Sequence, residues 1–328
     1  MPATRFTKLV GCTVPIQQAG MGALANKHLA AGVANAGGQG MLSWSGMPAD
    51  KLAETLDDLR KQTAGVLGVN FLIPGFEGFE EEPEVRECVS VAAARAKVID
   101  FFYTDPIPAL VDLVHQHGAL ACWQIGSPEE AVAAADAGCD FIIAQGIEAG
   151  GHIRGKVSLM ALLNQVLQVV EIPVLAAGGI GTGRNLAAVL AAGADGARVG
   201  TRFVAAEESG AHPYYVQALI QAEAEDTVYT DTFSYGWPDA PHRVLRSCVE
   251  AARAFEGEVV GERMSLSTGT RAPVHRFEPL PVMRDTTGSV EAMSLWAGES
   301  VAGVKKLQPA AEIIQELVGE AEKLLKSW

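Results

Sequence analysis

The sequence has 328 residues and a formal net charge of −14, because 25 Lys and Arg stand against 39 Asp and Glu. Apolar residues make up 48% of the chain and charged residues 20%, which is typical of a globular protein and excludes wholesale disorder. A surface this acidic repels a phosphate backbone and no basic run is present, so we expect no nucleic-acid partner.

Cysteine usage and hydropathy define the expected environment. No stretch approaches the roughly 18 uncharged apolar residues of a membrane span, and the first twelve residues lack the apolar core of a signal peptide. We therefore expect a cytoplasmic protein without a membrane partner. The cysteines form no C-x-x-C pair, so neither a disulfide framework nor a bound metal is expected. They are Cys12, Cys88, Cys122, Cys139 and Cys248.

The first two thirds of the chain alternate between short apolar runs and Ala- and Leu-rich helical stretches. Eight such runs recur about 20 to 35 residues apart, which is the length of a β-loop-α unit. Their apolar character predicts parallel strands covered by helices. Eight units favour a closed (β/α)8 TIM barrel over a doubly wound sheet. The predicted strands start near Pro15, Gly40, Leu67, Lys97, Ala119, Cys139, Pro173 and Gly196.

Two of the intervening segments carry complete helix signals. The segment 127–138 begins with Ser127 as N-cap and Pro128 at the first helical position, and it ends at Gly138. The segment 182–193 repeats the pattern, with Thr182 as N-cap and Gly193 as terminator. Both segments are therefore predicted helices.

The alternation of apolar runs and helical stretches ends after Phe203. Residues 211–227 are predicted to form one helix, and residues 226–300 are irregular, as expected for a smaller domain over the barrel mouth. The segment 308–328 has an apolar helical face, which predicts a helix that docks back on the barrel. The predicted division is a barrel in residues 1–220, a smaller cap or substrate domain in 221–304 and the C-terminal helix in 305–328.

Two glycine motifs follow the last two predicted strands. In AAGGIGTG and VGTRF, small residues leave backbone N–H groups free to surround an anion, although glycines also serve simply as tight turns. In barrels of this kind the loops after strands seven and eight commonly hold a phosphate. No G-x-G-x-x-G fingerprint is present, so the expected ligand is a mononucleotide. The candidate residues are Gly178, Gly179, Gly181, Gly200 and Thr201.

Amide side chains lie at several predicted strand ends. An amide both donates and accepts hydrogen bonds, which suits the edge of a flavin ring, whereas each one singly is also compatible with a buried structural role. The candidates are Gln17, Gln18, Asn70, Gln124 and Gln145.

His152 is the histidine with the strongest functional signal. It follows Gly150 and Gly151 at the end of the sixth predicted strand. A histidine there can take a proton from carbon or stabilise negative charge on a substrate. We expect it on a loop, where truncation costs roughly 0.5 kcal/mol. Arg154 is placed either to assist it or to face solvent.

Several motifs together resemble the nitronate monooxygenase family, formerly called 2-nitropropane dioxygenases. They are PIQQAGMG, GVNFLIP, AQGIEAGGHIRG, AAGGIGTGRNLAAVLAAGADGARVGTRF and LWAGESV, in the family's order. The resemblance implies an FMN-containing TIM barrel with a small second domain, and His152 as the catalytic residue. The family's flavin contacts fall on Gly20, Met21, Asn70, Gln124, Gly151, Gly178, Gly179, Gly200 and Thr201.

The resemblance implies FMN-dependent oxidation of alkyl nitronates by O₂, giving a carbonyl compound and nitrite. The flavin-dependent enoyl-acyl-carrier-protein reductases share most of the same motifs. The alternative is therefore an NAD(P)H-dependent flavin reductase that acts on an enoyl thioester or a quinone. The expected partners are a small-molecule substrate and O₂, and the sequence leaves open whether NAD(P)H is used and whether the chain forms a homo-oligomer.

Overall fold

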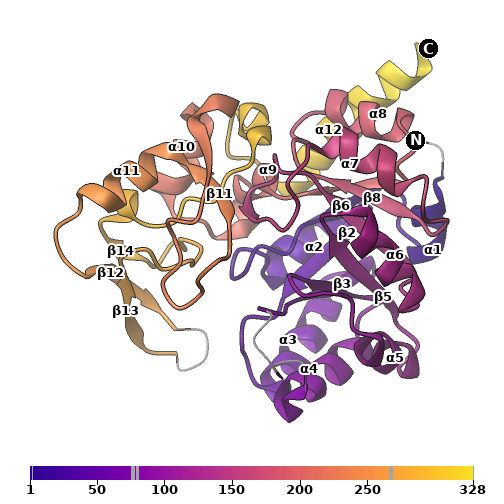
Figure 1. Cartoon of the computed structure of the whole chain (residues 1–328), viewed down its shortest axis with the longest axis horizontal. Helices are drawn as coiled ribbons and strands as arrows, with labels where there is room; N and C mark the ends of the chain where they lie inside the picture. The colour runs from indigo at the N-terminus through magenta and orange to yellow at the C-terminus, as the bar shows by residue number, and fades with distance from the viewer. Residues whose placement is uncertain (2, 75–77, 79–80, 266–268, 328) are drawn as a thin grey trace.

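Eight parallel strands close into a barrel in the order β1-β2-β3-β4-β5-β6-β8-β9 (Figure 1). The computed structural model describes residues 1, 3–74, 78, 81–265 and 269–327. Each barrel strand begins within two residues of a predicted start, so the predicted (β/α)8 fold is confirmed. The strands are β1 (Ile16–Gln18), β2 (Gln39–Ser43), β3 (Val66–Leu72), β4 (Val98–Phe102), β5 (Leu120–Ile125), β6 (Phe141–Gln145), β8 (Val174–Ala177) and β9 (Gly196–Val199).

Helices connect the strands and cover the outside of the barrel, and local signals set their ends. The Ser127 hydroxyl accepts a hydrogen bond from the Glu130 N–H at 3.2 Å, and Gly138 has a φ of +91° just after the helix. Both predicted capped helices are confirmed. The helices are α2 (Lys27–Asn35), α3 (Ala49–Gln62), α4 (Pro83–Ala93), α5 (Pro108–Gln116), α6 (Pro128–Asp136), α7 (Leu159–Val166) and α8 (Gly183–Ala191).

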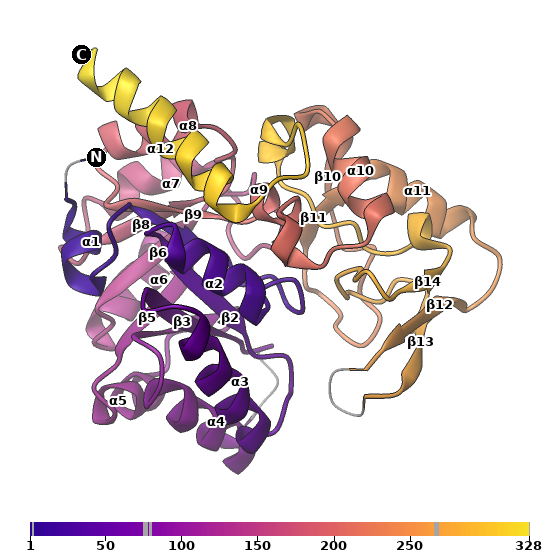
Figure 2. The ribbon, with the colours of Figure 1, turned by 180° about the vertical axis from the view of Figure 1, so that it is seen from behind.

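The C-terminal helix supplies the eighth position of the outer ring. The helix directly after β9, α9 (Thr201–Val204), has only 4 residues. Helix α12 (Ala310–Lys326) instead packs against α8 and α2 (Figure 2). Its side chains Ile313, Leu317 and Ala321 are buried in the same core as the barrel helices, which ties the chain end to the barrel.

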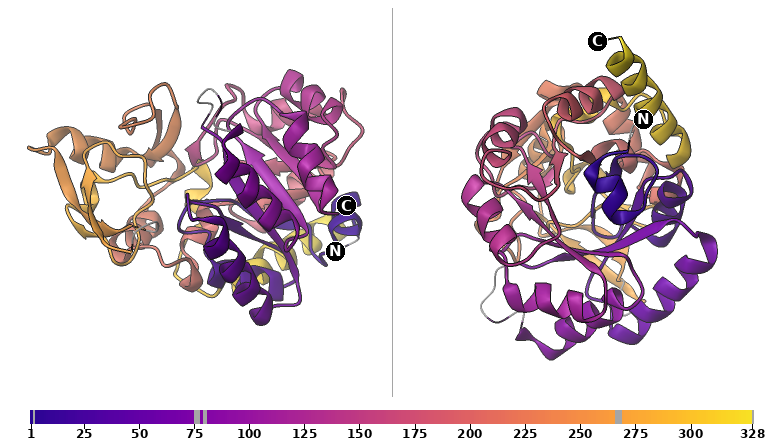
Figure 3. Two further views of the ribbon diagram at one scale, coloured as in Figure 1. Left: turned by 90° about the horizontal axis from the view of Figure 1, so that it is seen from below. Right: turned by 90° about the vertical axis from the view of Figure 1, so that its right-hand side faces the viewer.

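A short helix that the sequence analysis did not predict closes the opposite end of the barrel. Helix α1 (Arg5–Val10) is capped by Thr4 and Thr7 and ends at Gly11. Its Phe6 contacts Phe141 with ring centroids 5.4 Å apart, inside a cluster that fills the N-terminal end of the barrel. The right-hand view of Figure 3 looks at this end, with α1 in front.

The second domain consists of two small antiparallel sheets and two helices. One sheet has the order β10-β11-β7 and the other β13-β12-β14. The predicted helix over 211–227 is wrong in its second half, because α10 ends at Gln221 and residues 227–230 pair with β11 instead. The elements are α10 (Pro213–Gln221), β10 (Thr227–Thr230), β11 (His242–Leu245), α11 (Arg246–Ala254), β12 (Val259–Met264), β13 (Arg271–His275) and β14 (Thr287–Gly288).

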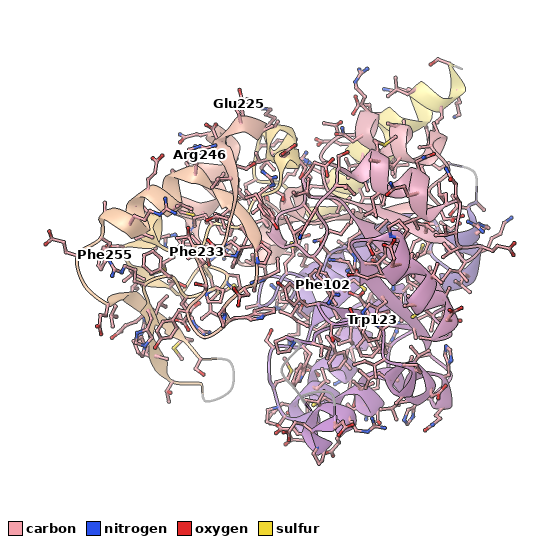
Figure 4. The ribbon with its side chains drawn as sticks, in the orientation of Figure 1. Phe102, Trp123, Glu225, Phe233, Arg246 and Phe255 are labelled. Atoms are coloured by element: carbon pink, nitrogen blue, oxygen red, sulfur yellow. The ribbon has the colours of Figure 1, made fainter. Side chains whose placement is uncertain are left out.

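The second domain has a hydrophobic core of its own, to which the buried Phe233 belongs (Figure 4). The strand β7 (Gly151–His152) lies between β6 and α7 in the chain, yet it pairs with β11 of this domain. The sheet β10-β11-β7 therefore combines a strand from the barrel segment with two strands of the second domain. The domain boundaries at residues 220 and 304 stay a prediction. Among the described residues, no helix is long and apolar enough to cross a bilayer.

Candidate active site

A cavity of about 750 Å³ lies between the barrel mouth and the second domain. Figure 4 places Phe102, one of its lining residues, where the two parts meet. Side chains at the carboxyl ends of the barrel strands form its floor, and Trp237 and Trp296 of the second domain form part of its cover. This is the end of a (β/α)8 barrel where active sites are found.

Nine of the ten residues that the family resemblance assigns to the site line this cavity. Gly179 does not, and neither does Gly181 of the predicted phosphate loop. Gly179 follows Gly178, which does, and both have positive φ values, +67° and +106°. Glycine adopts these conformations without strain, so the turn keeps the backbone open to the cavity side. The nine lining residues are Gly20, Met21, Asn70, Gln124, Gly151, His152, Gly178, Gly200 and Thr201.

The predicted amides separate into two groups. Gln145, Gln124 and Asn70 line the cavity. Gln17 donates to Gln39 Oε1 at 2.9 Å, and Gln18 donates to the Met41 carbonyl at 2.9 Å. Neither of these two lines the cavity, so the prediction that they face a ligand is wrong. Their side chains instead link β1 to β2 inside the barrel.

A buried ion pair under the cavity was missed by the sequence analysis. Arg198 on β9 and Asp100 on β4 are 4% and 0% exposed, and Arg198 Nη2 lies 2.8 Å from Asp100 Oδ2. Arg198 also donates to Gln17 Oε1 and Gln124 Oε1, each at 2.7 Å, and Asn70 donates to Asp100 at 2.6 Å. The available signal was a single charge inside each of two apolar strands, VIDFF and GARV.

Four buried polar atoms on residues of the cavity wall have no hydrogen-bond partner among the described residues. They are Gln145 Oε1, His152 Nε2, Arg263 Nε and Arg198 Nη2, and the last of these lies in the ion pair with Asp100. Buried polar groups are nearly always hydrogen-bonded, since an unmade bond costs about 1–3 kcal/mol. Gln145 Oε1 and His152 Nε2 lie at the barrel mouth, where they suit a ligand whose edge both donates and accepts hydrogen bonds.

His152 lies on β7 and not on the exposed loop that the sequence predicted. Its backbone pairs with His242 of β11, and its carbonyl accepts a hydrogen bond from Gln145 Nε2 at 3.0 Å. Its ring lies 4.3 Å from the Trp237 ring and 5.2 Å from the Trp296 ring, measured between centroids. The packing fixes the imidazole between these rings, so truncation costs more than at an exposed loop position.

Burial also sets the protonation state of His152. Burial, together with the smaller effect of the nearby His242, lowers the pKa of His152 to about 3. The residue as a whole is partly exposed, but Nε2 itself is fully buried. The imidazole is therefore neutral at pH 7, and the role as a cation that the sequence allowed does not fit this environment.

The low pKa predicts that His152 makes the protein less stable in acid. In the unfolded chain a histidine has a pKa of about 6.5, so between pH 6.5 and 3 the unfolded state binds a proton that the folded state does not. As the pH is lowered through this range, the free energy of unfolding should therefore decrease. This residue contributes at most about 1.4 kcal/mol for each pH unit. Denaturant unfolding between pH 4 and 6.5 should show a shallower fall for His152→Asn, and equal slopes would contradict this assignment.

Arg154 faces away from the cavity. Its guanidinium bonds Glu130 Oε1 at 2.8 Å and Asp105 Oδ1 at 2.5 Å, and it also donates to the Tyr103 carbonyl. It does not line the cavity. Arg154 thus holds the loop after β4 and does not assist His152 directly.

Fold and site define a barrel enzyme that holds its reactants between a (β/α)8 mouth and a small second domain. The family model described as nitronate monooxygenase matches residues 3–320. The chain therefore belongs to the nitronate monooxygenase family of flavin-dependent oxidoreductases.

Known proteins similar to this chain carry different names. A (3aS,4S,5R,7aS)-5-hydroxy-7a-methyl-1-oxo-octahydro-1H-indene-4-carboxyl-CoA dehydrogenase of Rhodococcus jostii is 35% identical over 79% of this chain and 70% of its own. The structure of FabK from Thermotoga maritima has a TM-score of 0.81 and 29% identity, covering 100% of this chain and 98% of that one. Nitroalkane oxidase from Streptomyces ansochromogenes has a TM-score of 0.78 and 28% identity, covering 99% and 100%.

Proposed function

We propose that the protein uses FMN to oxidise alkyl nitronates with O₂, giving a carbonyl compound and nitrite. The observation that carries the proposal is the neutral His152, which lines the cavity beside two tryptophan rings and has a buried Nε2 without a hydrogen-bond partner among the described residues. The structural similarity to a nitroalkane oxidase supports the same chemistry.

The residues around the cavity fit FMN. The positive-φ pair Gly178 and Gly179, with Gly200 and Thr201 at the start of α9, leaves backbone N–H groups for the phosphate. A side chain at Gly20 would collide with Asn70, because a Cβ there would lie 2.2 Å from Asn70 Oδ1. Gln145 Oε1, which has no hydrogen-bond partner among the described residues, suits the edge of the ring. FMN, when bound, supplies the electron acceptor that amino-acid side chains lack.

The same side chains fit an anionic substrate. A neutral imidazole of low pKa is a poor base for a nitroalkane, but it is a good hydrogen-bond partner for a nitronate that is already formed. Arg198 adds a fixed positive charge to the cavity floor, with Asp100 as its counter-ion. Trp237 and Trp296 cover His152 and keep water from the reacting carbon.

The cofactor proposal predicts that the purified protein is yellow and releases FMN, not FAD, when it is denatured. The reason is that the paired glycine motifs offer one phosphate site and the chain has no dinucleotide fingerprint. Chromatography of the released cofactor against both standards checks this prediction. Release of FAD, or a colourless protein, would contradict it.

A second candidate function is an NAD(P)H-dependent flavin reductase acting on an enoyl thioester or a quinone. The cavity favours it in one respect, because about 750 Å³ is far more than a small nitronate needs beside a cofactor. The 35% identity to a carboxyl-CoA dehydrogenase points the same way.

One experiment separates the two functions. Ethyl nitronate and NADH are each added to the holoenzyme without oxygen, and the flavin absorbance near 450 nm is followed; in a parallel sample with air, oxygen and nitrite are measured. We expect bleaching by the nitronate and about one nitrite for each nitronate consumed in air. Bleaching by NADH alone, followed by reoxidation with an enoyl thioester or a quinone, would favour the reductase and refute the nitronate proposal.

A further inference from the structure

Arg263 is a charged residue of the cavity wall that forms no ion pair with any described residue. It lies on β12 of the second domain and lines the same cavity as His152. Its guanidinium forms no ion pair or side-chain hydrogen bond with any described residue, and its Nε atom is buried without an acceptor. The Arg263 side chain is half-buried, and a guanidinium bonds an anionic oxygen more strongly than a neutral one, so we expect a ligand to supply such an acceptor there.

Two other charged residues line the described part of the cavity. Arg198 has Asp100 as its counter-ion. The Asp285 carboxylate accepts the Met264 N–H at 2.9 Å and forms no ion pair with a described residue. Among the described lining residues, Arg263 is therefore the cation that has no ion pair.

The surroundings of Arg263 indicate the rest of the ligand. Met264, Leu280, Pro281 and Met283 of the second domain also line the cavity and are apolar. An apolar chain that ends in a negative charge would satisfy both the walls and the guanidinium.

We propose that Arg263 binds an anionic oxygen group, a carboxylate or a phosphate, at the end of an apolar chain that lies on the second-domain side of the cavity. A guanidinium is suited to this role because it bonds two oxygens of such a group at once. The inference rests on the proposed function in one respect, namely that this cavity is the substrate site. Arg263 then selects substrates by their remote charged end.

Calorimetric titration of the holoenzyme with octanoate, octyl phosphate and octanol tests this inference. At least one of the anions should bind about 10-fold more tightly than octanol, as expected for one or two charge-assisted hydrogen bonds. In Arg263→Met this preference should fall to about 2-fold or less, and Arg263→Lys should retain part of it. The tighter of the two anions identifies the group as a carboxylate or a phosphate.

Arg271→Met is the matched control, because Arg271 is exposed on the neighbouring β13 and does not line the cavity. It should keep the full preference. Equal affinity of all three ligands for the wild type, or an unchanged preference in Arg263→Met, would overturn the inference. If Arg263→Met does not fold, Arg263→Gln takes its place. The titration measures binding and needs no turnover. The role of Arg263 can therefore be judged even if the protein does not oxidise nitronates.

Discussion

Replacing His152 by Ala is expected to lower kcat/KM for a pre-formed nitronate by about 10²–10⁴-fold, the usual contribution of a positioned acid–base or hydrogen-bonding group. The flavin should stay bound, because the groups that we assign to it lie on other residues of the barrel mouth. Both a neutral nitroalkane and its nitronate should lose rate, since an imidazole with a pKa of about 3 does not act as the base that forms the nitronate.

Oxygen consumption by wild type and variant with each substrate form checks this expectation. His28→Ala is the control, because His28 is exposed on α2 and does not line the cavity. His152→Asn preserves more of the packing between Trp237 and Trp296 than His152→Ala does. A similar loss of rate in both variants would therefore come from the missing imidazole and not from disturbed packing. Unchanged rates in both variants would remove His152 from the mechanism, and loss confined to the neutral nitroalkane would show that it acts as a base.

Replacing Arg198 by Met should lower the free energy of unfolding by about 3–5 kcal/mol, the usual result of removing one partner from a buried ion pair. The reason is that Asp100 would keep its charge at 0% exposure without its counter-ion. Gln17 and Gln124 would each also lose the donor that bonds their side-chain oxygen.

Denaturant unfolding of Arg198→Met, Asp100→Asn and the double variant measures this effect. The double variant should be less destabilised than the sum of the two single ones, because removing both charges leaves neither one unpaired. Arg95→Met is the control, since the Arg95–Asp57 pair is largely exposed and should contribute about 0–1 kcal/mol. A loss below about 1 kcal/mol in Arg198→Met would show that Asp100 finds another partner or a proton.

The sequence was most informative where the physical signal is local. A Ser127 side chain that caps its own helix, a proline at the next position and a closing glycine act over a few residues. The apolar runs and their spacing predicted all eight barrel strands. The two glycines before His152 predicted that it is a site residue, and it lines the cavity. Each of these features depends on neighbours in the chain, so the sequence alone was sufficient.

What only the tertiary structure decided involves partners far apart in the chain. Asp100 and Arg198 are single charges in separate strands, and only the closed barrel brings them together. Gln17 and Gln18 could not be told from ligand-facing amides, because their acceptors lie on β2. The same holds for His152: its neutral state comes from burial beside a second domain, and desolvation depends on every element packed around a group, not on its sequence neighbours.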